Sequence, residues 1–433
     1  MTDWQTRQAF DRDHIWHPYA PMPNPQSPLA VQSTQGSHLT LADGRDLIDG
    51  MSSWWAAIHG YNHPDIVKAM HHQIDVMPHI MFGGLTHQPA IDLAQKLVSL
   101  TPEGLEKVFF VDSGSVAMEV AIKMALQYQI SRGKPSKSRL LSIKGGYHGD
   151  TFATMALCDP DNGMHTTFGP LLPRHFFAPR PNPGMDKTDN SDIEALEAML
   201  AKHHDQIAAI TLEPIIQGAG GMRPYRPAYL KQVRALCDRF DVLLIADEIA
   251  TGFGRTGELF GCDWAGITPD IMALGKTLTG GHITLAATLA TEAVSDTISQ
   301  GEPGLLMHGP TYMANPLACA AASANIDTLL ASPWQANIAR IQRHFETHLR
   351  PLNERDSVKD VRILGAIAAV ELTRADLGPR IQDLAAEQSV WLRPFGALIY
   401  TMPAYNIGHR DLTRLTDGMK TAIDQALQES ATP

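Results

Sequence analysis

The run Val242-Leu243-Leu244-Ile245-Ala246 leads directly into an acidic pair, Asp247-Glu248, and a second apolar run, Ile271-Met272-Ala273-Leu274-Gly275, ends at Lys276. Consecutive apolar residues that end at a charged group are consistent with a buried strand that emerges at the edge of a sheet. Asp247 and Lys276 are 29 positions apart (276 − 247). We therefore expect both side chains at the carboxyl ends of parallel strands, where α/β sheets bind their ligands.

Strand and helix patterns alternate on both sides of this stretch. Short apolar runs at 107–111, 139–143 and 207–212 indicate further strands, whereas 115–128 and 230–240 have the periodicity of helices. This alternation predicts an α/β fold whose large domain has a mostly parallel sheet flanked by helices on both faces.

Both ends of the chain differ from this central region. A Ser-Pro pair at 332–333 marks a break, after which strand-like segments at 363–371 and 397–401 mix with helical ones at 338–349, 378–388 and 411–428. Strand-like pieces also occur at 37–41 and 46–49. We predict a large domain over residues 52–331 and a smaller α+β domain formed by both chain ends, residues 1–51 and 332–433.

Composition excludes several classes of partner. The net charge is −11 and no long basic run occurs, so a polyanion such as DNA is not expected to bind. The four cysteines show no CxxC spacing, and Cys237 and Cys319 lie in apolar or helical surroundings typical of core residues, which favours a reducing compartment. The first residues lack an apolar signal core, and no apolar stretch approaches the ~20 residues of a membrane helix. We expect a cytoplasmic protein without a membrane partner.

Lys276 and Asp247 together suggest a particular chemistry. A lysine just past a strand is usually solvated, but the small and apolar residues around Lys276 would desolvate its amine and lower its pKa. Such an amine can attack a carbonyl. Asp247 follows five apolar residues, so we expect it to be buried and to need a cationic partner. The protonated ring nitrogen of pyridoxal 5'-phosphate would be that partner, which predicts a Schiff-base enzyme.

Three loops add candidate binding groups. Asp112-Ser113-Gly114-Ser115 lies between a strand and a helix, where it could be an ordinary cap or could hold a phosphate. The glycine-rich turn Gly145–Asp150 carries Tyr147, which could stack on a planar cofactor. His308-Gly309-Pro310-Thr311 could complete a phosphate site. Glu213, at another strand end, is expected only in a supporting role.

Three other patterns lack residues that the sites they resemble would need. Gly252–Gly257 matches GxGxxG, but the helix and the distant acidic strand end of a dinucleotide site do not follow it. Gly275-Lys276-Thr277 imitates the end of a P-loop, yet Asp270 occupies the position of the first glycine. The histidines lack metal-binding spacing, so we predict no metal site.

The stretch Asp247–Gly257 and the later Leu274-Gly275-Lys276 resemble the class III aminotransferases, which are pyridoxal-phosphate enzymes of fold type I. Within this family, His14–Tyr19 and the tryptophan-rich Gly50–Pro64 resemble the branch that moves the amino group of S-adenosylmethionine to 8-amino-7-oxononanoate in biotin biosynthesis. Segments 307–311 and 391–396 support the narrower match. The resemblance covers essentially the whole chain.

This resemblance implies how the cofactor is held. Lys276 would carry it as an aldimine and shuttle the proton, while Asp247 would keep the ring nitrogen protonated. Gly114 and Ser115 would bind the phosphate. Pro310 and Thr311 would reach in from the other subunit, which implies a homodimer with active sites at the subunit interface.

The resemblance also implies a substrate pocket. Tyr147 would stack on the cofactor ring and touch substrate, and Arg393 would grip a substrate carboxylate through two parallel hydrogen bonds. Tyr19 and Trp54 would form walls, although core packing is a serious alternative for both. Tyr19 is also expected among the catalytic residues, and Gly309 among the residues that bind substrate.

The implied reaction is a ping-pong transamination that yields 7,8-diaminononanoate. Two alternatives stay within the family: an ornithine-type or other ω-amino acid aminotransferase, and the same product made with lysine as donor. A nucleotide-dependent NTPase or dehydrogenase built on the glycine loops is a rival from another class, and it requires bound ATP or NAD and an unreactive Lys276.

Overall fold

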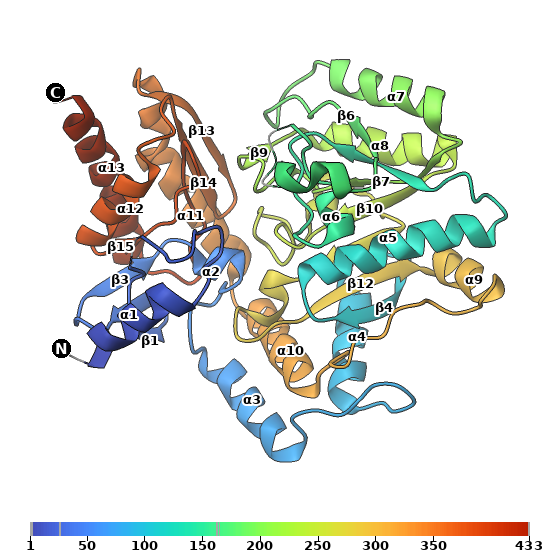
Figure 1. Ribbon diagram of the computed structural model, residues 1–433, viewed down its shortest axis with the longest axis horizontal. Helices are drawn as coiled ribbons and strands as arrows, with labels where there is room; N and C mark the ends of the chain where they lie inside the picture. Colours follow the sequence, from blue (N-terminus) through green and yellow to red (C-terminus); the bar gives the residue numbers. More distant parts are fainter. Residues whose placement is uncertain (1–2, 26, 162, 164, 432–433) are drawn as a thin grey trace.

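The computed structural model describes residues 3–25, 27–161, 163 and 165–431. In Figure 1 a large sheet flanked by helices occupies one side of the molecule, and the two chain ends lie together on the other side. The boundaries at residues 51/52 and 331/332 stay predictions, but the strand pairings described below join the two chain ends.

The central sheet has seven strands and is mostly parallel, which confirms the expected fold class. β12 is the exception, because it runs antiparallel to both of its neighbours, β11 and β4. The order across the sheet is β4 (Leu105–Val111), β12 (Ala286–Thr291), β11 (Ile271–Leu274), β10 (Leu243–Asp247), β7 (Ile207–Leu212), β5 (Arg139–Ile143) and β6 (Phe176–Ala178).

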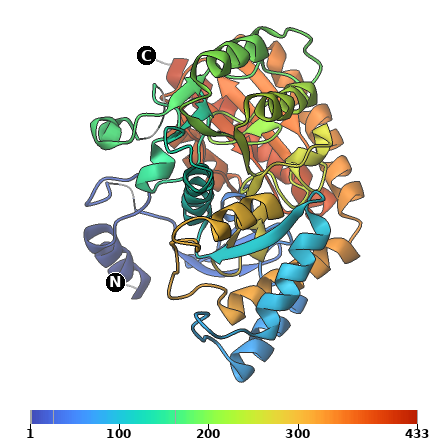
Figure 2. The ribbon, with the colours of Figure 1, turned by 90° about the vertical axis from the view of Figure 1, so that its right-hand side faces the viewer.

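Alternate residues of β10 enter two different cores, so both faces of the sheet are covered. Leu244 and Ala246 belong to one apolar cluster, whereas Leu243 and Ile245 belong to the other. Helices on the first side include α4 (Gln88–Leu100), α7 (Ser191–His203) and α8 (Pro227–Phe240), and helices on the second are α5 (Gly114–Ser131) and α9 (Glu292–Gln300). Figure 2 shows the sheet edge-on between these layers.

Two smaller sheets lie beside this unit. In the first, β3 pairs in parallel with β15, so strands from the two chain ends share one sheet. Its order is β1 (Val31–Gln35), β2 (His38–Leu41), β3 (Asp46–Asp49) and β15 (Val390–Trp391). The second contains β13 (Val358–Leu364), β14 (Ile367–Leu372) and β16 (Leu398–Thr401). Helices of this side are α1 (Asp3–His14), α11 (Trp334–His348), α12 (Gly378–Glu387) and α13 (His409–Ala431).

The segment 363–371, predicted as one strand, is a hairpin. β13 ends at Leu364 and β14 begins at Ile367, with Gly365 at φ 55° in the turn between them. A Cβ on Gly365 would lie 2.5 Å from the carbonyl oxygen of Arg255, so only glycine fits there. Apolar residues on both sides hide this turn in the sequence.

The remaining elements join these units. α10 (Pro316–Ala331) packs against both α3 (Pro64–Val76) and α4, and α3 lies at the lower edge in Figure 1. Short elements are α2 (Ser52–Trp55), α6 (Phe152–Met155), β8 (Ile216–Gln217), β9 (Arg223–Pro224), η1 (Thr166–Leu171), η2 (Gly261–Ala265), η3 (Lys276–Thr279) and η4 (Arg350–Glu354). Within the described residues, no helix combines the length and apolar character needed to cross a bilayer.

Candidate active site

The carboxyl ends of four adjacent strands bring the candidate residues to one rim of the sheet. β10 and β11 are parallel neighbours with Asp247 opposite Ala273, so Lys276, three residues after Ala273, emerges beside Asp247 as expected. Glu213 follows β7, and the turn with Tyr147 and His148 follows β5. The sheet therefore gathers groups that are more than a hundred residues apart in the chain.

Lys276 sits in an unusual backbone conformation. Its φ is +43°, in the left-handed region where a residue other than glycine costs about 1–3 kcal/mol. The side chain keeps some solvent exposure but is densely surrounded. Burial lowers the pKa of its amine, although the charges of Asp247, Glu213 and Asp150 oppose this shift. The result is an amine that deprotonates more easily than an ordinary lysine.

Asp247 is buried and paired with a histidine that the sequence did not single out. Nδ1 of His148 lies 2.8 Å from Oδ2 of Asp247, and the other carboxylate oxygen accepts a hydrogen bond from the Ile249 amide at 3.2 Å. Burial alone would lower the pKa of His148, but the hydrogen bond and charge of Asp247 outweigh it and raise that pKa. The pair thus holds a carboxylate in a fixed orientation inside the protein.

Glu213 is built into the same buried group. Its carboxylate accepts hydrogen bonds from the amides of Gly218 at 2.8 Å and Tyr147 at 3.1 Å. Burial raises the pKa of Glu213 to about 7, against the opposing charge of His148. Glu213 and His148 also line a small cavity with Gln217 and Tyr229. Glu213 therefore fixes the turn that carries Tyr147.

The amino end of α5 faces the same rim. Ser113 caps the helix by accepting a hydrogen bond from the Val116 amide at 3.4 Å. A Cβ on Gly114 would lie 2.9 Å from Cγ2 of Ile249, and one on Gly275 would lie 3.5 Å from Cα of Gly114. Glycines thus let the helix end approach the loops after β10 and β11, where its free N–H groups favour an anion. Ser115 Oγ accepts from the Asp150 amide at 3.1 Å.

An aromatic group connects the N-terminal segment to this rim. The Tyr19 hydroxyl donates to a carboxylate oxygen of Asp150 at 3.2 Å, and the Tyr147 side chain also acts on that hydroxyl. Burial raises the pKa of both tyrosines, and the Asp150 charge adds to it. The ring of His165 stacks beside Tyr147 with centroids 6.1 Å apart. Asp150 and His165 carried no distinguishing signal in the sequence.

A second aromatic group includes Arg393. The Trp54 side chain and the Arg393 charge both act on the hydroxyl of Tyr400. Burial raises the pKa of Tyr400, while these two neighbours lower it. Among the residues that the structure describes, Arg393 donates one hydrogen bond, to Gln382 at 3.1 Å, which leaves most of its five N–H donors available there. Tyr400 was missed because an aromatic within a buried strand is usually a core residue.

Among the described residues, the loop expected to complete the phosphate site makes no hydrogen bond to the other candidate site residues. Gly309 and Thr311 are exposed and Pro310 is half-buried, although the residues before them are fixed on α5. Lys123 Nζ lies 3.2 Å from the Met307 carbonyl and 3.0 Å from His308 Nδ1. Within the described part of the chain, no hydrogen bond links the Gly309–Thr311 loop to the Lys276 group.

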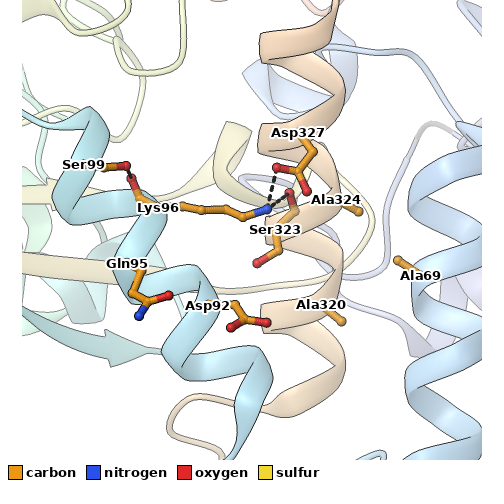
Figure 3. Close-up of a pocket in the computed structure, with 9 residues that line it drawn as sticks. All are labelled: Ala69, Asp92, Gln95, Lys96, Ser99, Ala320, Ser323, Ala324 and Asp327. Atoms are coloured by element: carbon orange, nitrogen blue, oxygen red, sulfur yellow. Dashed lines mark hydrogen bonds and ion pairs between the residues drawn. The ribbon is translucent and has the colours of Figure 1, made fainter.

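A larger hollow lies away from this rim. It measures about 650 Å³ and opens between α3, α4 and α10. Figure 3 shows Lys96 crossing it to the Ser323 carbonyl at 3.5 Å and to the Asp327 carboxylate. Alanine and serine residues, Asp92, Gln95 and the Lys96–Asp327 ion pair line this hollow. Around Lys276, by contrast, lie several groups with shifted pKa values, among them His148, Glu213 and Tyr147. We therefore place the chemistry at the rim.

The residues at the rim fit pyridoxal phosphate. Lys276 offers an amine of lowered pKa, and the α5 end offers free N–H groups with no side chain at Gly114. Each Asp247 oxygen takes one hydrogen bond, so the carboxylate can still accept another from a ring N–H.

Relatives share this architecture. The family model Aminotransferase class-III matches residues 19–423. An adenosylmethionine-8-amino-7-oxononanoate aminotransferase from Buchnera aphidicola subsp. Acyrthosiphon pisum is 50% identical, over 97% of this chain and 98% of that protein. The structure of the enzyme of that name from Methanocaldococcus jannaschii has a TM-score of 0.92 at 34% identity, over 98% and 99% of the two chains. An omega transaminase from Pseudomonas jessenii, in complex with PMP, has a TM-score of 0.90 at 29% identity, over 97% and 98%. This chain belongs to the class-III aminotransferase family.

Proposed function

We propose that this aminotransferase moves the amino group of S-adenosylmethionine to 8-amino-7-oxononanoate, giving 7,8-diaminononanoate in biotin biosynthesis. The observation that carries this proposal is the 50% identity, over almost the full length of both chains, to a relative named for that reaction. The reaction is ping-pong: the donor leaves as its keto acid before the ketone of the acceptor takes up the amino group.

Pyridoxal phosphate is the cofactor, and when bound it supplies a carbonyl for the amine and an electron-accepting ring. Lys276 would hold it, and then Nζ would take the proton from the donor's α-carbon and pass it to the cofactor carbon that carries the nitrogen. In the second half-reaction Nζ would move a proton from that cofactor carbon to the carbon of the acceptor's former ketone. Asp247 would accept a hydrogen bond from the ring N–H, with His148 fixing the carboxylate. Gly114 and Ser115 would bind the phosphate at the α5 end.

One pocket must accept two unlike substrates in turn. Both carry a carboxylate, and Arg393, with most of its donors free, suits this shared group. Trp54 and Tyr400 would form the wall beside it, while Tyr19 and Tyr147 would face the reacting carbon from the other side. Tyr19 would act through its hydrogen bond to Asp150, which sets the direction of its hydroxyl.

We also propose a homodimer with active sites at the subunit interface. The Gly309–Thr311 loop, exposed at Gly309 and Thr311, supports this proposal, because it could complete the phosphate site of a second copy. A cytoplasmic location is proposed as well, supported by four buried cysteines that are free thiols.

A donor competition tests the substrate assignment. Purified enzyme with 8-amino-7-oxononanoate is given S-adenosylmethionine, lysine or ornithine, and 7,8-diaminononanoate is measured by mass spectrometry. We expect product with S-adenosylmethionine and none from a Lys276→Ala variant. Product from lysine alone would replace the donor but keep the acceptor. No product with any donor, together with amination of simple ketones, would favour the ω-transaminase alternative that the Pseudomonas jessenii structure represents.

A further inference from the structure

The four residues of α2, Ser52 to Trp55, form a left-handed turn. Their φ values are +44°, +46°, +56° and +80°. None of them is glycine, and L-residues adopt this region singly rather than in runs. Such a turn persists only where its surroundings hold it. The question is which contacts do so, because Trp54 stands within it.

Asp49 is the first holding contact. This buried carboxylate precedes the turn at the end of β3 and accepts hydrogen bonds from the amides of Met51 at 2.7 Å and Ser53 at 3.2 Å. The oxygen that binds Ser53 also accepts from the Tyr61 hydroxyl at 2.6 Å. Burial raises the pKa of Asp49, and these hydrogen bonds oppose the rise. One carboxylate therefore ties both flanks of the turn to Tyr61.

Tyr61 is the second holding contact, and it is fixed independently of the turn. Its backbone exchanges two hydrogen bonds with Gly36, at 2.7 Å and 3.1 Å, in the hairpin between β1 and β2. Its hydroxyl also lies 2.5 Å from Oγ of Ser53, inside the turn. The neighbouring Asn62 donates to the Thr34 carbonyl at 2.5 Å. The hairpin therefore fixes the backbone of Tyr61, and the Tyr61 hydroxyl holds the 52–55 turn through Asp49 and Ser53.

The turn reaches the substrate pocket through one side chain. Gly50, just before the turn, is bonded to the segments that carry Tyr400 and Arg393. Its carbonyl accepts hydrogen bonds from the Met402 amide at 2.8 Å and from Thr401 Oγ1 at 2.7 Å, and its amide donates to the Trp391 carbonyl at 3.0 Å. Burial raises the pKa of Tyr400, and Trp54 and Arg393 both act on its hydroxyl to lower that pKa. We propose that Asp49 and Tyr61 are positioning residues for substrate binding, which hold the 52–55 turn and so place Trp54 against Tyr400 and Arg393. This inference rests on the proposed function, in which these three residues bind substrate.

The test removes the hydroxyl that grips the turn. In Tyr61→Phe holoenzyme we expect KM for both substrates to rise about tenfold, less than the roughly 100-fold that a 1 Å misplacement can cost. We expect kcat to stay within about twofold, because Lys276 and Asp247 are untouched. Cofactor absorbance should not change. Asp49→Asn should shift KM in the same direction. Tyr128→Phe is the matched control: it lies 14 residues beyond Gly114 on α5, roughly 21 Å along the helix, and should leave KM unchanged.

A double-mutant cycle separates positioning from general structural support. If Tyr61 acts through Trp54, then Tyr61→Phe should add less than about twofold to KM in a Trp54→Ala background. An unchanged KM in Tyr61→Phe alone would overturn the proposal. A full tenfold addition in the Trp54→Ala background would also overturn it, because Tyr61 would then act on another part of the site.

A wrong substrate assignment can be told apart from a wrong positioning role for Asp49 and Tyr61. Wild-type enzyme that does not use S-adenosylmethionine contradicts the proposed function before any variant is made. The cycle is then run with 4-aminobutyrate or ornithine, whichever bleaches the cofactor band of the wild type, and the same KM criteria decide whether Asp49 and Tyr61 position Trp54.

Discussion

Nδ1 of His148 lies 2.8 Å from Oδ2 of Asp247, and both side chains are buried at the carboxyl rim of the central sheet. An ionised carboxylate can only accept, so this histidine nitrogen carries the hydrogen. The contact joins the turn after β5 to the end of β10. It orients the carboxylate at the end of the strand that neighbours the strand leading to Lys276.

Removing the Asp247 charge should slow the reaction without ejecting the cofactor. In Asp247→Asn we expect kcat to fall by about 100–1,000-fold, the cost of removing one electrostatic group from a preorganised site. Borohydride reduction and peptide mapping should still find the cofactor on Lys276. Asp296→Asn, an exposed aspartate on α9, is the control and should retain full kcat. A kcat of Asp247→Asn equal to that of the control would remove Asp247 from the mechanism.

Arg393 should contribute to binding both substrates. Arg393→Ala should raise KM for the donor and the acceptor by roughly 10–100-fold, the value of charged hydrogen bonds worth about 1.5–3 kcal/mol. Arg393→Lys should recover only part of this, because an ammonium cannot make two parallel bonds. Steady-state kinetics with each substrate measures KM of the two Arg393 variants. The control is Arg374→Ala, which removes an exposed arginine paired with Asp376. An effect on one substrate alone would contradict a shared carboxylate site.

Subunit complementation tests the interface. A Lys276→Ala chain and a Thr311→Glu chain should each be inactive alone. If Thr311 serves the partner's site, random pairing of the two should restore about a quarter of wild-type activity, because half of the dimers would contain one intact site of two. Activity is measured after joint refolding or co-expression. Recovery would not occur if Thr311 served the site of its own chain.

The two chain ends should come apart more easily at high pH. His38 on β2 lies 2.6 Å from Asp46 and 3.0 Å from Asp411 on α13. Burial alone would lower its pKa, but the hydrogen bonds to Asp411 and Asp46 raise it overall. Because the folded pKa is raised, the stabilisation is fully present below about pH 6.5 and is lost as pH rises through the folded value.

The contribution of His38 should be about 1 kcal/mol or less, since the contact is partly solvated. Between pH 6 and pH 9 the wild-type free energy of unfolding should therefore fall more than that of His38→Gln. Thermal melts at a series of pH values measure this difference, with the exposed His71→Gln as control. Parallel pH profiles for wild type and His38→Gln would show that the contact contributes nothing.

Much of the rim was predictable from the sequence because strand ends are easy to recognise. Apolar runs that stop at Asp247 and before Lys276 define neighbouring parallel strands, and the structure pairs them as expected. The direction of β12 was not predictable, because a fully buried strand has the same apolar pattern whichever way it runs.

The supporting contacts were hidden for a different reason. His148 and Asp150 lie in a glycine-rich turn whose path depends on distant amide contacts to Glu213 and Ser115. The left-handed turn at 52–55 contains no glycine, so nothing local signals it. Such features arise from tertiary contacts, which a single sequence does not display.

The two half-reactions, followed separately in an absorbance titration, test the central claim most directly. Adding S-adenosylmethionine to the holoenzyme should bleach the absorbance band of the bound cofactor, and adding 8-amino-7-oxononanoate should restore it. Lys276→Ala should show neither change. A band that ornithine or a simple ω-amine bleaches, and that S-adenosylmethionine leaves intact, would contradict the account.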